Sequence, residues 1–356
     1  MKRTHFEAFR PFCPYCRHNG DGEQPLRISF EAKANSTEIL EGALQCTHAA
    51  CLGEYPIIDG LPVLVPNVRT WVVENLDRLM ARSDLAPEIE SLLGDCSGPN
   101  SAFDARRQHL SNYAFDHYGD FDPDPDPSGA EPASIVRSLK RGLQLLGDSP
   151  GPVLDLGCGV GRGAFEMAQR TDDLVLGVDL HAPMMQLAST VLRTGQVTAP
   201  RRRVGVVYDR RSFPVSLPHA ERVDFWIADA LALPFVPGTF GTVIAQNVLD
   251  CSASPIGLLA AVRDQLVSGG GAVLATPYDW SPGATAYEAW IGGHSQRSPA
   301  GGASEPLLRE LLGGSHPQAI EGLTAVGEDL NVPWHVRLHD RAVMQYRAHV
   351  VALRRA

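Results

Sequence analysis

The chain has 356 residues, of which 44% are hydrophobic and 20% are charged. This apolar fraction is ordinary for a globular protein and excludes a disordered chain, and the length suggests about two domains at roughly 150 residues each. No stretch approaches the roughly 18 uninterrupted apolar residues of a membrane helix. The start, MKRTHFEAFRPFCPYC, lacks the apolar segment of a signal peptide. These observations predict a soluble, cytoplasmic protein.

The charge balance bears on the kind of partner. The chain carries 31 basic and 41 acidic residues, a net charge of −10. Because phosphate contacts supply much of the affinity for nucleic acids, their binders usually show a basic footprint. The acidity therefore counts against DNA or RNA and favours a small-molecule substrate. The dense basic stretch, Arg201–Arg203 with Arg210 and Arg211, is interpreted as a solvated loop.

Four of the seven cysteines lie within the first 51 residues, at Cys13, Cys16, Cys46 and Cys51. In a long chain without a secretion signal, such a cluster indicates metal binding rather than disulfides. A CxxC turn and a CxxxxC turn flank LRISFEAK, which alternates as a strand does, and together they predict a four-thiolate structural zinc site. His48 is an alternative to Cys51 as the fourth ligand. We expect Cys51, because His48 lies only two residues after Cys46.

The segment after the second pair, YPIIDGLPVLVP at 55–66, resembles the zinc-ribbon proteins that partner tRNA and protein methyltransferases. The resemblance implies a zinc-ribbon domain over residues 1–66. It also implies that the ribbon serves stability, a homodimer contact or a protein partner rather than catalysis.

Residues 67–135 are expected to form a helical linker or lid. Apolar residues at helical spacing in Trp71–Leu93 predict one or two helices. The acidic, proline-rich stretch 119–129 predicts an exposed loop. The remaining part, 136–356, is expected to be a second domain.

A glycine-rich turn follows the apolar run in GPVLDLGCGVGRG, residues 151–163. Asp155, Gly157, Gly159 and Gly161 form DxGxGxG between a predicted strand and the predicted helix GAFEMAQR. Glycines permit a tight turn and let backbone N–H groups approach a ligand closely. Cys158 inside the turn is interpreted as a small packing residue. Taken alone, this turn suits a nicotinamide dinucleotide equally well.

The later strands favour a different nucleoside. LVLGVD ends in Asp179, about 20 residues after the glycines, where a carboxylate can accept hydrogen bonds from ribose hydroxyls. The helix that begins there would wall an adenine ring, and VDFWIADA ends in Asp229, suited to the adenine amino group. Another buried strand ends in Gln246-Asn247, and GGGAVLAT predicts a fifth strand.

This ordered set, over about residues 150–280, resembles the class I S-adenosylmethionine (SAM) dependent methyltransferases. The resemblance implies an α/β fold, with a seven-stranded, doubly wound, Rossmann-like sheet and a small N-terminal zinc-ribbon domain. It implies that SAM, or its product S-adenosylhomocysteine (SAH), lies at the carboxyl ends of the first strands. The implied cofactor-binding residues are Asp155, Gly157, Cys158, Gly159, Gly161, Asp179, Leu180, Met184, Asp229, Ala230 and Gln246.

Methyl transfer from a sulfonium requires the protein to align an acceptor, because the cofactor already carries the activation. Asn247 and Asp250, at the mouth of the fourth strand, are predicted to fix the tautomer of an acceptor ring. His117 and Tyr118 complete the predicted catalytic residues, and Tyr118, Tyr278 and Trp334 are expected to form a wall for the ring. The predicted substrate-binding residues are Tyr113, Tyr278, Trp280, Trp334 and His335, with Arg341, or Arg337 in its place, for a substrate carboxylate.

A narrower resemblance covers about residues 111–356. FDHYG, TPYDW, EAWIGG and the final segment DLNVPWHVRLHDRAVMQYRAHVVALRR resemble the ovothiol-pathway methyltransferases that act on 4-mercaptohistidine. The resemblance implies an N-methyltransferase of a histidine-derived imidazole. Two alternatives stay open, an RNA methyltransferase that uses the zinc ribbon for recognition and a non-catalytic SAM-binding scaffold.

Overall fold

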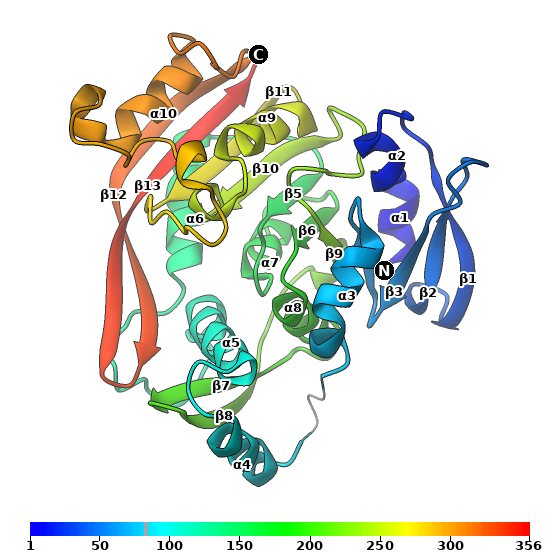
Figure 1. Ribbon diagram of the computed structural model, residues 1–356, viewed down its shortest axis with the longest axis vertical. Helices are drawn as coiled ribbons and strands as arrows, with labels where there is room; N and C mark the ends of the chain where they lie inside the picture. Colours follow the sequence, from blue (N-terminus) through cyan, green and yellow to red (C-terminus); the bar gives the residue numbers. More distant parts are fainter. Residues whose placement is uncertain (82–84) are drawn as a thin grey trace.

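The computed structural model describes residues 1–81 and 85–356 (Figure 1). The strands are β1 (Leu26–Ala34), β2 (Ile39–Cys46), β3 (Glu54–Ile58), β4 (Leu61–Leu64), β5 (Val153–Leu156), β6 (Val175–Asp179), β7 (Gln196–Val204), β8 (Val207–Pro214), β9 (Val223–Ala228), β10 (Phe240–Gln246), β11 (Leu266–Thr276), β12 (Leu323–His339) and β13 (Ala342–Arg355). The α-helices are α1 (Arg3–Phe9), α2 (Pro14–His18), α3 (Val68–Leu79), α4 (Pro87–Ser97), α5 (Ala102–Tyr118), α6 (Ser134–Leu146), α7 (Arg162–Ala168), α8 (Ala182–Thr194), α9 (Pro255–Gln265) and α10 (Ser304–Gly313). Short 3₁₀ helices occupy Ala220–Arg222, Leu249–Cys251, Tyr287–Ala289 and Pro299–Gly302.

The central sheet has the order β1-β2-β3-β4-β9-β6-β5-β10-β11-β13-β12, and β7 and β8 form a separate hairpin. Strands β9, β6, β5, β10 and β11 run parallel to one another. Strand β13 is antiparallel to β11, and β12 is antiparallel to β13. The seven strands from β9 to β12 therefore form the doubly wound, Rossmann-like sheet that the sequence predicted, which confirms the fold class.

Helices cover both faces of this sheet. Because side chains alternate along a strand, Leu154 and Trp226 pack on the face covered by α1, α9 and α10, whereas their neighbours Val153 and Phe225 pack under α6, α7 and α8. Burial on both faces explains why β5, β9 and β10 are apolar almost throughout.

The N-terminal strands extend the same sheet. Strands β1 to β4 pair in antiparallel order, and β4 then runs parallel to β9, with Val63 opposite Ile227. Helix α1 lies against the core, where the ring centroid of Phe9 is 6.2 Å from that of Trp226 and 5.2 Å from that of Phe240. Figure 1 shows this blue segment at one edge of the molecule. Residues 1–66 are thus continuous with the central sheet, which their sequence alone did not indicate.

The helical segment 67–135 contains α3, α4 and α5. Of the helices predicted within Trp71–Leu93, α3 ends at Leu79 and α4 begins at Pro87, and residues 82–84 lie outside the described residues. The stretch 119–129 has no helix or strand. However, its Asp122 and Asp126 side chains are only 10% and 11% exposed, so the prediction of an exposed loop is wrong at these carboxylates.

The basic stretch 201–211 belongs to the β7–β8 hairpin, so its interpretation as a solvated loop is wrong. Arg210 pairs with Glu90, and Arg211 pairs with Asp122 and Asp124. These arginines therefore join the hairpin to α4 and to the acidic stretch 119–129. Opposite charges far apart in the sequence compensate each other here.

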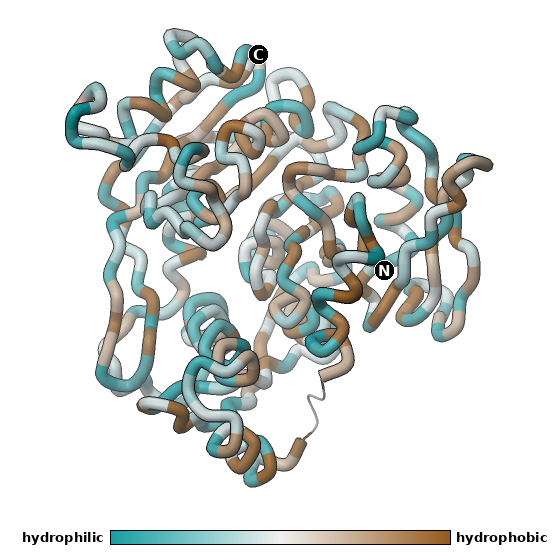
Figure 2. Tube along the Cα trace, in the orientation of Figure 1, coloured by the Kyte–Doolittle hydropathy of each residue, from teal (hydrophilic) through white to brown (hydrophobic). Residues whose placement is uncertain are grey.

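No helix among the described residues is long and apolar enough to cross a membrane. Figure 2 shows the same property along the trace, where hydrophobic positions come in short runs separated by polar ones.

Candidate functional site

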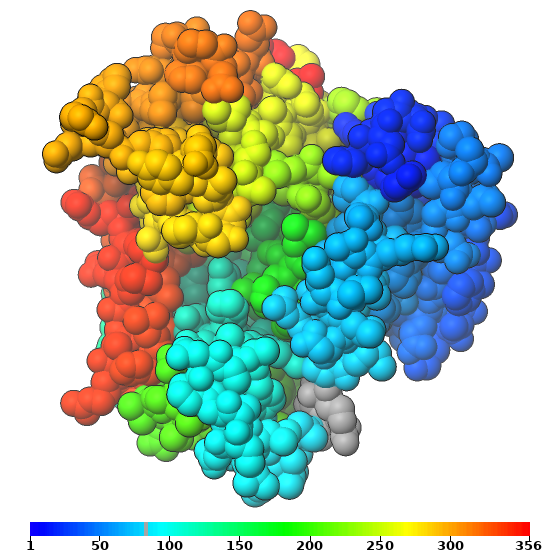
Figure 3. All heavy atoms as spheres, in the orientation of Figure 1, coloured from blue at the N-terminus to red at the C-terminus, as the bar shows by residue number. Residues whose placement is uncertain are grey.

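A cavity of about 710 Å³ lies at the carboxyl ends of the parallel strands. Residues at or just after the ends of five strands line it, namely Gly157, Asp179, Asp229, Gln246 and Pro277. In open α/β sheets this edge is where ligands bind. The space-filling view shows the surface hollowed between the cyan α5 segment, the yellow segment near residue 280 and the red β12–β13 hairpin (Figure 3).

The glycine-rich turn after β5 is held by Asp179. Gly159 N–H donates to Asp179 Oδ2 at 3.0 Å, and His181 N–H donates to Asp179 Oδ1 at 2.8 Å. The turn needs glycine where its backbone has positive φ, as at Gly161 (φ 92°), where an added Cβ would lie 2.5 Å from the ring of Phe225. Burial raises the pKa of the Asp179 carboxyl.

The predicted cofactor residues divide into two groups. Those that line the cavity are Gly157, Asp179, Leu180, Met184, Asp229, Ala230 and Gln246. Those that shape the turn from behind are Asp155, Cys158, Gly159 and Gly161. Cys158 is buried with its Sγ 3.6 Å from Met185 Sδ, in keeping with a packing role. Asp155 is 2% exposed and lies against the start of α7, where a Cβ added at Gly163 would be 2.6 Å from its Oδ2 atom, and it is not among the residues that line the cavity.

Three polar side chains at and just after the end of β10 have polar atoms that a ligand could bind. The amide of Gln246, the Oδ1 atom of Asn247 and the Oδ1 atom of Asp250 are buried without a hydrogen-bond partner in the described chain. All three residues line the cavity, with Gln246 6% exposed and Asp250 2% exposed. Asn247 also has a positive φ of 54°, in the left-handed region that asparagine tolerates better than most residues. Buried polar atoms are normally satisfied, so a ligand is expected to complete them.

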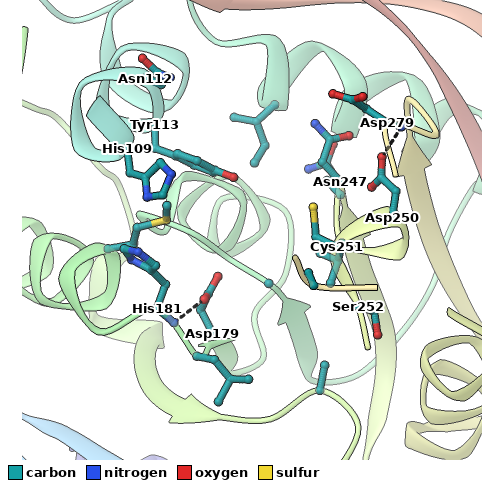
Figure 4. A pocket seen from close by; sticks show the side chains of 18 of the residues that line it. His109, Asn112, Tyr113, Asp179, His181, Asn247, Asp250, Cys251, Ser252 and Asp279 are labelled. Atoms are coloured by element: carbon teal, nitrogen blue, oxygen red, sulfur yellow. Dashed lines mark hydrogen bonds between the residues drawn. The ribbon is translucent and has the colours of Figure 1, made fainter. Parts of the chain in front are cut away.

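Helix α5 supplies the opposite wall through residues spaced three and four apart, which lie on one helical face. These are His109, Asn112, Tyr113, Asp116 and His117. Figure 4 shows the Tyr113 hydroxyl directed across the cavity toward Asn247 and Cys251. We did not predict His109, Asn112 or Asp116 as site residues, although their helical spacing from Tyr113 would have identified them.

Burial shifts the pKa values of two neighbouring side chains of α5 in opposite directions. Burial lowers the pKa of His117 to about 3, and its Nδ1 accepts a hydrogen bond from Arg162 N–H at 3.2 Å. A neutral ring with Nδ1 occupied carries its proton on Nε2, so His117 acts as a hydrogen-bond donor and not as a base. Burial raises the pKa of Asp116 to about 7, while Ser134 N–H donates to its Oδ1 at 2.8 Å.

Tyr118, predicted as catalytic, faces away from the cavity. Its side chain is fully buried, and its hydroxyl donates to the carbonyl oxygen of Val160 at 2.6 Å. It therefore packs α5 against the glycine-rich turn, and the prediction of a catalytic or ring-wall role is wrong.

Strand alternation explains which residues of the final hairpin reach the cavity. Trp334 lies opposite Tyr346, and Val336 lies opposite Met344, and all four line the cavity. The alternate positions face the other side. His335 Nδ1 accepts a hydrogen bond from Glu131 N–H at 2.9 Å, so the predicted substrate role of His335 is wrong.

The two arginines predicted for a substrate carboxylate do not serve it. Arg337 is completely buried in ion pairs with Asp126 and Asp340. Arg341 lies in the exposed turn between β12 and β13. Both predictions are wrong. The alternation of β12 directs Arg337 to the face opposite Trp334 and Val336, and Arg341 lies beyond the end of the strand.

Tyr278 and Trp280 follow β11 but point toward other partners. The Tyr278 hydroxyl lies 2.7 Å from His349 Nδ1, and His349 Nε2 lies 3.0 Å from Glu328 Oε2. Trp280 stacks on Trp290, with ring centroids 6.0 Å apart. The residue between them, Asp279, lines the cavity instead. The predicted ring-wall role of Tyr278 and the predicted substrate-binding role of Trp280 are therefore wrong.

A second cluster lies in the N-terminal segment. The sulfur atoms of Cys13, Cys16, Cys46 and Cys51 all lie within 4.8 Å of one another, with Cys13 to Cys51 at 3.8 Å and Cys16 to Cys46 at 3.7 Å. Tetrahedral zinc with Zn–S bonds of about 2.3 Å places its sulfurs about 3.8 Å apart. The four thiols therefore fit a zinc ion. His48 Nδ1 lies 3.7 Å from Cys16 Sγ, next to this cluster.

Comparisons with known proteins concern the central part of the chain. Residues 154–274 match the family described as a methyltransferase domain. The methyltransferase GfsG of Streptomyces halstedii is 28% identical over 132 residues, which are 36% of this chain and 38% of that protein. The chain thus aligns with well under half the length of this relative.

Two solved structures are also similar. The CcbJ methyltransferase of Streptomyces caelestis has 18% identity and a TM-score of 0.40, covering 66% of this chain and 100% of that chain. Phosphoethanolamine N-methyltransferase 2 of Haemonchus contortus, solved with S-adenosyl-L-methionine, has 21% identity and a TM-score of 0.30, covering 38% and 28%. Residues 154–274 thus match the methyltransferase-domain family, and the strand order is that of an α/β, Rossmann-like methyltransferase fold.

Proposed function

We propose that this protein is a SAM-dependent methyltransferase that methylates a nitrogen atom of a small molecule, with an imidazole or a related amine as the acceptor. The observation that carries the proposal is the set of unpartnered, buried polar atoms on Gln246, Asn247 and Asp250. They face the same cavity as Asp179 and the glycine-rich turn.

The residues of the cavity fit the cofactor at several points. Asp179 would accept hydrogen bonds from the ribose hydroxyls, because each carboxylate oxygen keeps a free lone pair beside its backbone bond. Leu180, Asp229 and Ala230 would hold the adenine ring. The unpartnered amide of Gln246 would bind the amino-acid part. When bound, SAM supplies a methyl group already activated by its sulfonium.

The acceptor would lie between α5 and the residues after β10. Asn247 Oδ1 and Asp250 Oδ1 would accept hydrogen bonds from substrate N–H groups and so orient the nitrogen lone pair. That lone pair forms the new bond to the methyl carbon, and the electrons of the carbon–sulfur bond stay on sulfur. An imidazole then releases the proton of its other ring nitrogen to water, whereas an amine releases a proton from the methylated nitrogen itself. A neutral imidazole, with a pKa near 6.5, needs no strong base for this step.

A histidine-derived ring, such as 4-mercaptohistidine, is the acceptor that the sequence resemblance favours. Its ring N–H would suit Asn247. Its carboxylate has no partner in Arg337, which is held in ion pairs with Asp126 and Asp340, or in Arg341, which lies in the exposed turn between β12 and β13. The imidazole part of the prediction is therefore better supported than the amino-acid part.

The N-terminal segment is proposed to hold one structural zinc ion through Cys13, Cys16, Cys46 and Cys51, whose sulfur spacing supports it. No open coordination position is needed, because four protein ligands complete a tetrahedron.

An RNA substrate receives no support from the basic stretch 201–211. Arg210 and Arg211 are paired with carboxylates of the chain itself, so they are poor candidates for phosphate contacts.

The test combines binding with turnover. Calorimetry should show SAM and SAH binding to the full chain, and transfer of a radiolabelled methyl group should occur to pooled imidazoles or amines and not to total RNA. An exposed surface variant on the loop before β6, Asp173→Asn, serves as the control. Binding without transfer to any acceptor would favour the non-catalytic scaffold, and transfer to RNA alone would contradict the small-molecule proposal.

A further inference from the structure

The two ends of the cavity differ in their polar side chains. Near Asp179 lie Arg78, His109 and His181, and the ring centroids of the two histidines are 5.6 Å apart. Burial is the main cause that lowers the pKa of both rings, and the charge of Arg78 adds to it. At the other end lie carboxylates. Figure 4 shows the two histidines on one side, and Asp250 and Asp279 on the other.

The acidic end is built around Asp250, which is 2% exposed. Its Oδ2 atom accepts a hydrogen bond from Asp279 N–H at 2.7 Å, while its Oδ1 atom is buried without a partner in the described chain. Asp279 is exposed at the rim, where its carboxylate accepts a hydrogen bond from the Tyr346 hydroxyl. Asp116 lines the same cavity from α5. Two buried carboxyl groups, those of Asp250 and Asp116, and the exposed carboxylate of Asp279 thus line the same cavity.

No basic side chain compensates these acids among the described residues that line this end. Arg78 is the one arginine of the lining, and it lies at the histidine end. Arg337 is committed to Asp126 and Asp340 on the opposite side of its strand. Clustered carboxylates without counter-charges attract a cation and repel an anion.

The remaining walls of this end suit an organic cation better than a hydrated metal ion. Trp334 and Tyr346 form a cross-strand pair, and Val336 and Met344 form the next pair on the same face. Aromatic faces attract organic cations, and the effect grows when water is displaced. Apolar walls favour a compact carbon skeleton around the charge.

We infer that the acceptor end of the cavity selects a substrate with two nitrogen atoms, one protonated and one neutral. The protonated amine lies against Asp250 and Asp279, beside the Trp334–Tyr346 pair, and the neutral nitrogen is the one that receives the methyl group. Two different nitrogen atoms are required because a protonated nitrogen has no lone pair with which to accept the methyl group. A carboxylate beside the protonated amine is excluded by repulsion. This inference rests on the proposed function and narrows its substrate class.

Binding to the SAH complex of the full chain provides the test, with three related probes. Histamine carries an ammonium group without a carboxylate, histidine carries both, and imidazole-4-acetate carries only the carboxylate. In calorimetry, histamine should bind at least about tenfold more tightly than either of the other two. The preference should shrink as salt concentration rises.

The matched variants are Asp279→Asn and the surface control Asp173→Asn. Because Asp279 is exposed at the rim, its replacement should leave the fold intact. We expect Asp279→Asn to weaken histamine binding about 10- to 100-fold, the range for losing a hydrogen bond to a charged group. SAH affinity should be unchanged in both variants, and histamine affinity should be unchanged in the control.

The possible failures are distinguishable. If SAH does not bind to the wild type, the proposed function itself is wrong. If SAH binds but histamine does not, or binds no better than imidazole-4-acetate, the inference about the cation is overturned while the methyltransferase proposal stands. If Asp279→Asn weakens SAH as strongly as histamine, the carboxylates serve the cofactor, and the inference is equally overturned.

Discussion

Gly159 N–H donates to Asp179 Oδ2 at 3.0 Å although the two residues are 20 positions apart. The other carboxylate oxygen accepts a hydrogen bond from His181 N–H at 2.8 Å. One side chain at the end of β6 therefore fixes both the glycine-rich turn after β5 and the start of α8. A carboxylate in this position shapes the cavity before any ligand enters it.

Asp179→Asn tests this position. The amide keeps one oxygen acceptor, but its NH₂ group would face a backbone N–H donor. The substitution also removes the charged acceptor for the ribose hydroxyls. We expect SAM binding to weaken by about 1–3 kcal/mol, the cost of losing hydrogen bonds to a charged group. Calorimetry measures the change, with Asp173→Asn as the control. Unchanged affinity would contradict the assignment of Asp179 to the ribose.

Asp116 predicts a pH dependence of stability. Its pKa is raised to about 7 in the folded chain, against about 3.9 when unfolded. Between these values the folded chain binds more protons than the unfolded chain. The contribution of Asp116 is therefore complete below about pH 4 and is lost as the pH rises toward 7, by up to about 1.4 kcal/mol per pH unit.

The measurement compares wild type with Asp116→Asn, because the amide oxygen can still accept the hydrogen bond from Ser134 N–H. Chemical denaturation at several pH values should show the wild type losing stability relative to the variant between about pH 4 and pH 7. A constant difference between the two would show that Asp116 ionises normally. His117, whose lowered pKa acts in the opposite direction below about pH 6.5, is present in both proteins and cancels.

Zinc removal should affect more than the N-terminal segment. We expect about one zinc per chain by elemental analysis, and none after Cys16→Ser and Cys46→Ser are combined. Because β4 pairs with β9 up to Ala228, the residue before Asp229, chelation should lower the melting temperature of the main unfolding transition and weaken SAM binding. A separate, low-temperature transition with SAM affinity intact would show that the segment folds independently. Absence of zinc in protein purified without chelators would refute the metal site.

Trp334 on β12 and Arg341 in the turn after this strand give a paired prediction for the acceptor. Trp334 lines the cavity, whereas Arg341 lies in the exposed turn. Trp334→Leu should raise KM for the acceptor about tenfold, because an aromatic wall is lost while the residue stays apolar. Arg341→Ala should leave KM unchanged. A larger effect of Arg341→Ala in steady-state kinetics would restore the arginine as a carboxylate partner.

Sequence reasoning was sufficient for features with strong local signatures. The buried strands β5, β9 and β10 have near-continuous apolar sequences because both faces are covered. Asp179, Gln246 and Asn247 could be predicted at the cavity because the carboxyl ends of parallel strands meet at one edge. The four cysteines could be grouped because few other functions explain their spacing.

The side chains of the acceptor end were harder to predict, because the register of a strand decides which of its residues face the cavity. Trp334 and His335 are adjacent in the sequence, yet only Trp334 reaches the cavity. Arg337 resembled a substrate ligand until its long-range partner Asp126 was known. Likewise, nothing local to residues 61–64 indicated that β4 pairs with β9.

The pairing of β4 with β9 sets a practical limit on dissecting this protein. Shortened versions that begin after residue 66 would leave β9 with one side of its backbone unpaired, over a strand whose residues are buried throughout. Unprotected apolar edges of this kind recruit strands from other molecules. Such fragments should be recovered mainly as aggregates. Attempts to obtain a minimal catalytic unit would then fail for reasons of solubility, even though no residue of the cavity after β5 had been removed.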